Sequence, residues 1–455
     1  MKQIKNTNCV MKHILKTVYV KAACFMFMLL SLSNPVLSAA QYDYIDITNP
    51  FFRKIPIAVP QFKALTLDEQ AREVTRSTVD NISEALEFAG YFKILDRSKF
   101  LYDPEKSGIS TSDINFKNWR AVGADFLVTG GVQVKENILE MELRLFDTVK
   151  EQTLIGKRYK GMLKDQRRMI LRFCSELIFQ LTGNRGVYDS RIALISTTTG
   201  HKEIFMADFD GKNPTQFTRH NSITLSPAWS SDLKWIAYTS YAQGKPDLYI
   251  KNIKEQRGVR VAQKGLNITP AWMPGQFSLA ATLSFSGDQE IYLLTGTGKI
   301  IKRLTYNTDI DISPSWSPDG KKMAFVSKRE GTPQIHILDM GSNSVERLTF
   351  HGKYNTQPAW SPKGNVIAYS GMENGVSNIY LMGVDGKGPV QLTDGTGYNE
   401  SPTWSPDGSL IAFSSTREGP SRIYVMTAFG TDQRRLLTLP GEQTNPSWSP
   451  HGYND

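Results

Sequence analysis

The chain has 455 residues, of which 40% are hydrophobic and 21% are charged, so it is long enough for two or three globular domains. This composition excludes a disordered or low-complexity chain. The formal net charge is +9, but five lysines precede the first acidic residue, Asp43, and removing them leaves +4. Charge therefore gives little support for an acidic partner, and we predict no binding of nucleic acid.

Residues 1–39 predict a cleaved export signal. The early lysines lead into the apolar run 22–30, and Pro35 and the small residues 38–40 follow it. The apolar run is too short to span a bilayer comfortably, although an uncleaved membrane anchor is the alternative. Cys9 and Cys24 lie in this segment, so Cys174 is left alone and the mature chain is expected to form no internal disulfide.

Residues 40–183 predict a small α/β domain, followed by a linker at 184–190. A capping box at Thr66–Glu69 opens a helix that closes at Gly90, and a second amphipathic helix runs from about Asp165 to Gly183. Cys174 lies on the apolar stripe of the second helix and is predicted to be a packed core residue, not a nucleophile. Apolar runs predict strands at 45–47, 55–59, 91–95, 126–128 and 139–145.

From residue 191 onward, one sequence unit returns six times. Its tryptophans stand 43, 44, 44, 44 and 44 residues apart, a period typical of four-stranded propeller blades. Turn sequences such as Pro318-Asp319-Gly320 separate four short apolar runs in each unit. One such sheet cannot bury both of its faces alone, so we predict that residues 191–455 form an all-β six-bladed β-propeller with the tryptophans in the seams between blades. The six are Trp229, Trp272, Trp316, Trp360, Trp404 and Trp448.

The two ends of the repeat region complement each other. Residues 191–218 match the last three strands of a unit with no tryptophan strand before them, and residues 445–452 supply a tryptophan strand with nothing after it. We therefore predict that one blade is built from both ends of the propeller.

Motifs for catalysis are not found. There is no Gly-x-Ser-x-Gly elbow, no phosphate-binding glycine loop and no HExxH. His336 stands where other repeats carry Tyr or Phe, so packing explains it, and Asp319 and Asp407 fit turns. We predict a chain that is not an enzyme and binds no metal or cofactor. The alternatives are a propeller hydrolase, a peptidase-associated propeller and a propeller that scavenges a small ligand.

Polar residues stand five positions before each of the six tryptophans. The loops that lead into these strands are expected to share one face with the loops after each second strand and to surround the mouth of the central channel. Short hydrogen-bonding side chains there are suited to an extended peptide or a protein loop, whereas the alternative is that they only terminate loops and cap turns. The predicted partner-binding residues are Thr224, Asn267, Thr269, Asp311, Ser313, Asn355, Gln357, Asn399, Glu400 and Gln443.

The export signal, the α/β domain and the six Pro-x-Trp-Ser-Pro-Asp-Gly units together resemble the TolB family, periplasmic propeller proteins of the Tol-Pal envelope system. The likeness covers essentially the whole mature chain, although similar units occur in propellers of prolyl peptidases, and Met273-Pro274-Gly275 departs from the pattern.

This resemblance implies a monomeric, non-enzymatic adaptor in the periplasm. Such an adaptor binds the lipoprotein Pal through its propeller and TolA and other inner-membrane Tol proteins through its N-terminal part. Its roles are outer-membrane integrity and envelope constriction in cell division. By the same resemblance, a stretch whose alternation suits strand addition engages TolA: Gln41, Tyr42, Asp43, Tyr44, Ile45 and Asp46.

Overall fold

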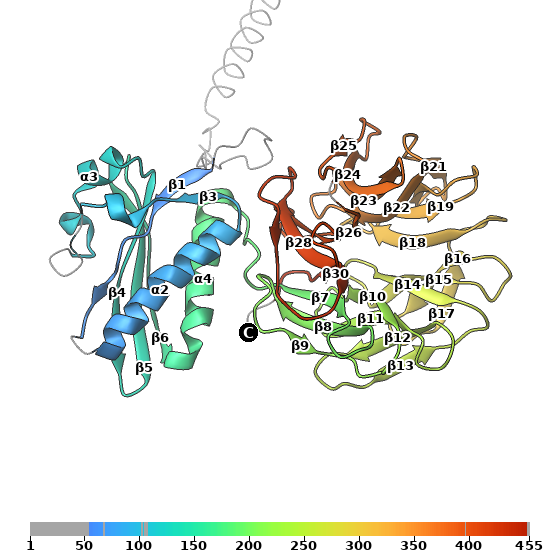
Figure 1. Ribbon diagram of the computed structural model, residues 1–455, viewed down its shortest axis with the longest axis horizontal. Helices are drawn as coiled ribbons and strands as arrows, with labels where there is room; N and C mark the ends of the chain where they lie inside the picture. The colour runs from blue at the N-terminus through green and yellow to red at the C-terminus, as the bar shows by residue number, and fades with distance from the viewer. Residues whose placement is uncertain (1–53, 67–68, 102, 104–107, 396, 453–455) are drawn as a thin grey trace, which may run out of the picture. The chain divides into compact units, whose positions relative to one another are not determined.

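The computed structural model describes residues 54–452 except 67–68, 102, 104–107 and 396 (Figure 1). The predicted export signal at 1–39, the predicted partner-binding stretch at 41–46 and the predicted strand at 45–47 lie outside these residues. None of the helices in the described ranges is long and apolar enough to cross a membrane.

The first domain is built on a mixed sheet in the order β3-β1-β4-β5-β6, with a short strand, β2, beside β4. β1 runs parallel to β3 and β4, whereas β4, β5 and β6 are antiparallel. The predicted strands at 55–59, 91–95, 126–128 and 139–145 are present, but β6 was not predicted. The bounds are β1 Ile55–Ala58, β2 Lys63–Ala64, β3 Phe92–Ile94, β4 Phe126–Lys135, β5 Ile138–Asp147 and β6 Gln152–Met162.

Two long helices, α2 (Glu69–Phe88) and α4 (Gln166–Thr182), pack against each other and against this sheet (Figure 1). Gly183 ends α4 in the left-handed conformation, and its N–H bonds the Phe179 carbonyl, as expected of a helix-closing glycine. Cys174 is fully buried, and burial raises the pKa of its thiol, so it is a core residue as predicted. Shorter elements are α3 (Phe116–Ala121) and 3₁₀ turns at Arg97–Lys99, Thr111–Asp113 and Leu163–Asp165.

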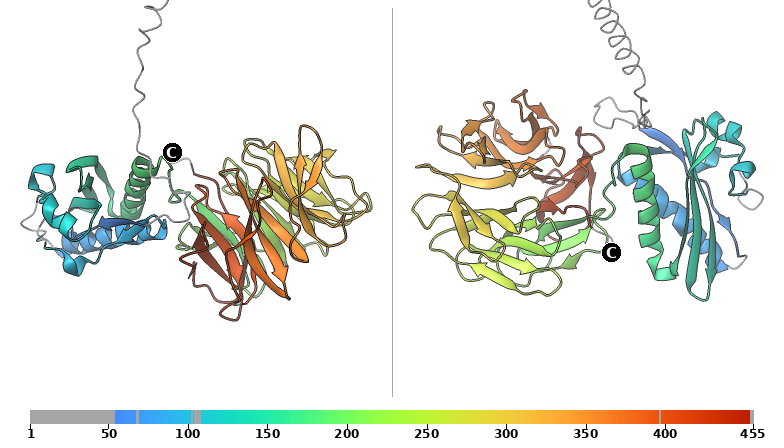
Figure 2. Two further views of the ribbon diagram at one scale, coloured as in Figure 1. Left: turned by 90° about the horizontal axis from the view of Figure 1, so that it is seen from above. Right: turned by 180° about the vertical axis from the view of Figure 1, so that it is seen from behind.

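The second domain consists of six four-stranded antiparallel sheets arranged around a common axis, which confirms the six-bladed propeller (Figures 1 and 2). Each blade begins with the strand that ends at its tryptophan, and this first strand contacts the first strands of both neighbouring blades. The five blades formed by consecutive strands comprise β10 Thr224–Trp229, β11 Trp235–Ser240, β12 Asp247–Asn252, β13 Gly258–Val261; β14 Asn267–Trp272, β15 Ser278–Leu283, β16 Glu290–Thr295, β17 Ile300–Arg303; β18 Asp311–Trp316, β19 Lys322–Ser327, β20 Gln334–Asp339, β21 Val345–Arg347; β22 Tyr354–Trp360, β23 Val366–Glu373, β24 Val376–Gly383, β25 Val390–Gln391; and β26 Asn399–Trp404, β27 Leu410–Ser415, β28 Arg422–Thr427, β29 Arg434–Arg435.

The sixth blade closes the ring with strands from both ends of the domain, as predicted. Its order is β30-β7-β8-β9, so the last strand of the chain pairs with the first strand of the propeller (Figure 1). The bounds are β7 Arg191–Ser196, β8 Glu203–Asp208, β9 Thr215–Gln216 and β30 Gln443–Trp448.

The repeated tryptophans join neighbouring blades, as the sequence predicted. All six are buried, and each apolar cluster between blades contains one of them. The Trp229, Trp272, Trp316 and Trp404 indoles donate hydrogen bonds of 2.9 to 3.2 Å to carbonyls in the first strand of the preceding blade. A tryptophan in this position therefore both fills the seam and satisfies its polar atom.

Candidate functional site

One face of the propeller, here called the mouth face, carries two sets of loops: the lead-in loops before each first strand and the loops between second and third strands. Side chains connect the two sets. The Arg329 guanidinium lies 2.8 Å from Asp311 Oδ2, and Arg417 donates to Asn399 Oδ1 at 2.9 Å. The prediction that these loops share one face is therefore confirmed.

The six polar residues five positions before the tryptophans are buried, with at most 2% of their surface exposed. Their side chains bond to nearby loops and strands; the Asn355 amide, for example, donates to Gln334 Oε1 and to the His351 carbonyl at 2.7 and 2.6 Å. Their contact with a partner stays a prediction. Because these six side chains are buried, a substitution of one of them is expected to affect binding indirectly, by changing the loops to which it bonds. The six are Thr224, Asn267, Asp311, Asn355, Asn399 and Gln443.

Two residues further on, each first strand carries a residue in the left-handed region, with φ between +47° and +57°. The pairing register with the second strand shifts at this point in all six blades. Such a conformation costs a non-glycine residue about 1 kcal/mol or more. Because it recurs in all six blades together with the register shift, it is a regular part of the architecture at the mouth. This axial ring consists of Ser226, Thr269, Ser313, Gln357, Ser401 and Asn445.

Hydrogen bonds connect members of the axial ring from blade to blade. The Ser401 amide donates to Gln357 Oε1 at 2.9 Å, and the Asn445 side chain donates to Ser401 Oγ at 3.1 Å. On the other side, the Ser313 amide donates to Thr269 Oγ1 at 3.4 Å. The structure thus brings the predicted Thr269, Ser313 and Gln357 into one ring, and adds three members that the sequence did not reveal.

A polar cavity of about 220 Å³ opens beside this ring. The predicted residues Gln357 and Glu400 line it, together with Tyr398, Asn445 and Lys202. Amide, hydroxyl and charged groups in one small cavity are suited to the polar side chains of an inserted peptide or loop. Within the described ranges, no three His, Cys, Asp or Glu side chains are placed to hold a metal ion.

Large apolar side chains surround the mouth face and were missed by the sequence reasoning. Tyr306 and Phe350 are 74% and 68% exposed, and Tyr398 is 50% exposed. The Arg303 and Arg347 guanidiniums lie 4.8 Å from the centres of the Tyr306 and Phe350 rings, respectively, and so orient them. The sequence did offer one signal for them: Tyr306 and Phe350 each follow a threonine at the end of a repeat, outside the predicted strands.

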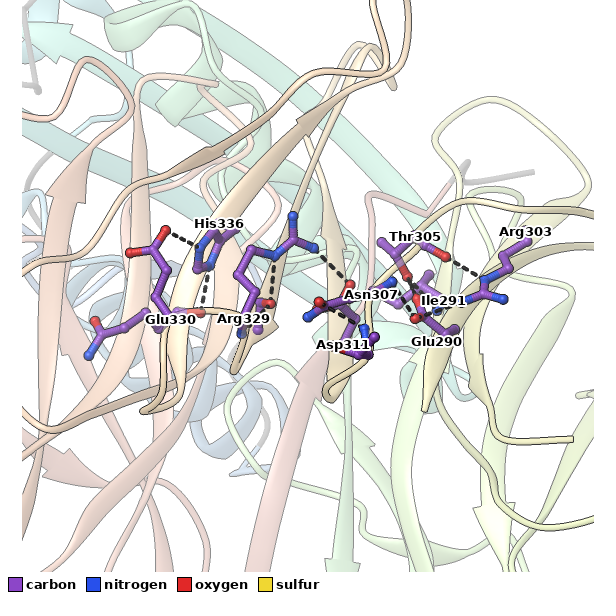
Figure 3. Close-up of polar contacts among 12 residues, drawn as sticks. Glu290, Ile291, Arg303, Thr305, Asn307, Asp311, Arg329, Glu330 and His336 are labelled. Atoms are coloured by element: carbon purple, nitrogen blue, oxygen red, sulfur yellow. Dashed lines mark hydrogen bonds and ion pairs between the residues drawn. The ribbon is translucent and has the colours of Figure 1, made fainter. Parts of the chain in front are cut away.

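A buried carboxylate holds the loop that presents Tyr306 (Figure 3). Glu290 is fully buried, and its Oε1 lies 2.7 Å from Arg303 Nη2 and accepts from the Asn307 amide at 2.7 Å. Its Oε2 accepts from Thr305 Oγ1 at 2.6 Å. These bonds compensate the desolvation of the carboxylate and fix both ends of the turn around Tyr306.

His336 occupies the aromatic position of its blade, as predicted. Its ring packs 5.9 Å from Phe325, where the equivalent pair Phe413 and Tyr424 lies 6.0 Å apart. Nδ1 lies 3.2 Å from the Gln334 carbonyl, and Nε2 lies 3.7 Å from Glu330 Oε1 (Figure 3). Burial is the main cause that lowers the pKa of His336, and Arg329 adds to it against the opposing effect of Glu330.

Replacing His336 is expected to change how stability depends on pH. Because its folded-state pKa is below the unfolded value near 6.5, the unfolded chain binds the proton more readily, and acid weakens the fold as pH falls through that value. The His336→Phe variant removes this loss, so its free energy of unfolding should fall less between pH 7 and pH 5.5. Urea denaturation at several pH values measures the slope, and equal slopes would contradict the prediction.

Asp319 and Asp407 stabilise turns, as the sequence predicted. Each accepts the hydroxyl of the serine two residues earlier and the backbone N–H two residues later, Ser317 and Lys321 in the first case. These bonds lower the pKa of Asp319, which remains ionised as a turn acceptor.

Comparisons with known proteins agree with this architecture. A protein-family model described as the TolB beta propeller domain matches residues 179–452, and a second family model, described as the TolB amino-terminal domain, matches residues 43–154. The chain is 57% identical over 271 residues to the Tol-Pal system protein TolB of Desulfosudis oleivorans, with 60% of this chain and 62% of that protein covered. It is 46% identical over 249 residues to the protein TolB homolog of Chlorobaculum tepidum, with 55% and 56% covered.

The alignments thus span less than two thirds of the length of these relatives. Among solved structures, TolB from Acinetobacter baumannii superimposes with a TM-score of 0.76 at 27% identity, covering 88% of this chain and 97% of that one. Both domains and their order are therefore matched, and the chain belongs to the TolB family.

Proposed function

We propose that this protein is a non-enzymatic periplasmic adaptor that binds the outer-membrane lipoprotein Pal through the mouth face of its propeller. In this role it supports outer-membrane integrity and envelope constriction during cell division. Membership in the TolB family supports the assignment to the Tol-Pal system.

The observation that carries this proposal is the combination of a polar cavity with an exposed aromatic rim on one face. Tyr398 belongs to both, because it lines the cavity and is half exposed. Aromatic side chains are enriched in protein-binding surfaces, where a few of them contribute most of the affinity.

The second part of the proposal concerns the inner membrane. By family resemblance, residues 41–46 engage TolA, and the N-terminal domain communicates with other Tol proteins. The alternation of apolar and polar residues in this stretch supports binding by strand addition to a partner sheet.

The triple variant Tyr306→Ala, Phe350→Ala, Tyr398→Ala tests the mouth face. We expect its affinity for purified Pal to fall by at least a hundredfold, because each buried aromatic anchor typically contributes 1 kcal/mol or more. Calorimetric titration of the exported protein with soluble Pal measures the affinity, and circular dichroism confirms that the variant is folded.

A matched control removes three other exposed apolar side chains, all in the α/β domain: Leu101→Ala, Val149→Ala and Phe179→Ala. This control should bind Pal like the wild type. Equal losses in both variants would remove the mouth face from the proposal. If the wild type binds no Pal and captures no envelope protein, the adaptor role fails, and the propeller should be assayed for hydrolase activity.

A further inference from the structure

The outer edge of two neighbouring blades differs from the rest of the propeller in charge. The nine residues that end blade β14–β17, 295–303, contain Lys299, Lys302 and Arg303 and no acid. The equivalent residues 252–260 contain three cations against Glu255. In contrast, the equivalent segments of the other four blades, 208–216, 339–347, 383–391 and 427–435, carry net charges of −1, −1, 0 and +1, so the largest positive charge lies on these two blades.

Two cations of this edge, Arg260 and Arg303, pair with the buried Asp247 and Glu290, and the others are exposed. Five of them make no ion pair within the described part of the chain, whereas most cations of β6 and α4 do. A charge that is unpaired and exposed remains available to an external anion. The five, here called the basic rim, are Lys234, Lys254, Arg257, Lys299 and Lys302.

Apolar side chains lie among these cations. Val259, Ile300, Ile301 and Phe277 are 40%, 37%, 52% and 46% exposed. Single exposed apolar residues are unremarkable, but here four of them accompany five unpaired cations in the turns and last strands of two adjoining blades.

The two blades form one continuous surface at this point. A Cβ placed on Gly298 would lie 2.7 Å from Val261 Cγ2, so the last turn of one blade touches the last strand of the other. The Phe277 ring lies 5.4 Å from that of Trp235 in the neighbouring blade. β13 and β17 are the outermost strands of their sheets (Figure 1), and their outer edges pair with no other described strand.

We infer that this edge is a second binding surface, separate from the mouth face, and that it binds an anionic membrane surface. Free lysines and arginines attract acidic lipid headgroups, and the exposed isoleucines, valine and phenylalanine gain by entering the boundary of the acyl chains. A second copy of the same edge is disfavoured, because pairing would bring like charges together. Contact with lipid would hold the propeller against a leaflet independently of any protein partner.

The test is the partition of the exported protein onto vesicles of phosphatidylglycerol and phosphatidylcholine, measured by flotation at low ionic strength. The rim variant Lys254→Gln, Arg257→Gln, Lys299→Gln, Lys302→Gln should lower the partition coefficient by about a hundredfold or more, since each cation near an anionic surface contributes substantially. Wild-type protein should bind vesicles of phosphatidylcholine alone only weakly.

A matched control neutralises four exposed lysines of the α/β domain that also make no ion pair with the described residues: Lys93, Lys117, Lys135 and Lys150. Its net charge equals that of the rim variant, so its partition should stay within about threefold of the wild type if position matters more than total charge. Replacing Ile300 and Ile301 by serine keeps every charge and should lower binding by about tenfold.

Two results of these assays would overturn the inference: no binding of the wild type to anionic vesicles, or equal losses in the rim and control variants. A competition experiment with soluble polyglutamate gives a third, namely vesicle binding that is undiminished while polyglutamate occupies the rim. In the last case the rim would be a site for acidic peptides. None of these assays contains Pal, so their failure is independent of the proposed adaptor role.

Discussion

Removing residues 441–455 is expected to prevent the propeller from folding, although the described part of this segment, 441–452, holds only one strand. β30 pairs with β7 and contacts the first strands of both neighbouring blades, so its loss leaves β7 as an open edge. It also removes Trp448, whose burial alone typically stabilises a protein by about 3–5 kcal/mol. Since whole domains are stable by roughly 5–15 kcal/mol, the truncated ring should be largely unfolded at 25 °C.

Near-ultraviolet circular dichroism and urea denaturation report this loss. The control is removal of residues 453–455 alone, which keeps β30 and should leave the unfolding midpoint unchanged. Adding a synthetic peptide of residues 441–455 to the truncated chain should restore part of the signal, because the missing strand has only one place in the ring. A truncated protein with the midpoint of the wild type would show that closure contributes little.

The blade count and the closing blade could be predicted because the repeat fixes both. A tryptophan every 43 or 44 residues defines the blades, and incomplete units at the two ends can only complete each other. β6 could not be predicted in the same way. Most of its residues between Gln152 and Met162 are exposed, so no alternation of apolar and polar residues marks it as a strand.

The mouth face was predicted as a location but only partly as a set of residues. Polar residues five positions before each tryptophan were visible in the sequence, yet the structure buries all six. The left-handed residue two positions later changes the direction of the strand. A serine, threonine or glutamine at such a position gives no sequence signal for a positive φ, so this bend could not be predicted. Exposed aromatics such as Tyr306 and Phe350 were missed because sequence alone does not separate an exposed ring from a core ring.

The variant Arg303→Met is expected to destabilise the protein by about 3–5 kcal/mol, because it leaves a buried carboxylate without its cationic partner. Glu290 is fully buried, and Arg303 is its cationic partner at 2.7 Å. The repeat itself shows that a neutral pair can occupy this site: Asn378 and Gln391 stand at the equivalent positions of another blade, where Asn378 Oδ1 still accepts from Thr393 Oγ1 at 2.9 Å.

The double variant Glu290→Asn, Arg303→Gln should therefore cost less than Arg303→Met alone, even though it changes both residues. Urea denaturation of the wild type, Glu290→Asn, Arg303→Gln and the double variant closes a double-mutant cycle and gives the interaction energy directly. A loss below about 1 kcal/mol for Arg303→Met would mean that Thr305 and Asn307 suffice to hold the carboxylate. The same four proteins separate stability from binding, because Arg303 also orients the Tyr306 ring. If the proposed adaptor role holds, the double variant should regain stability without regaining full affinity for Pal.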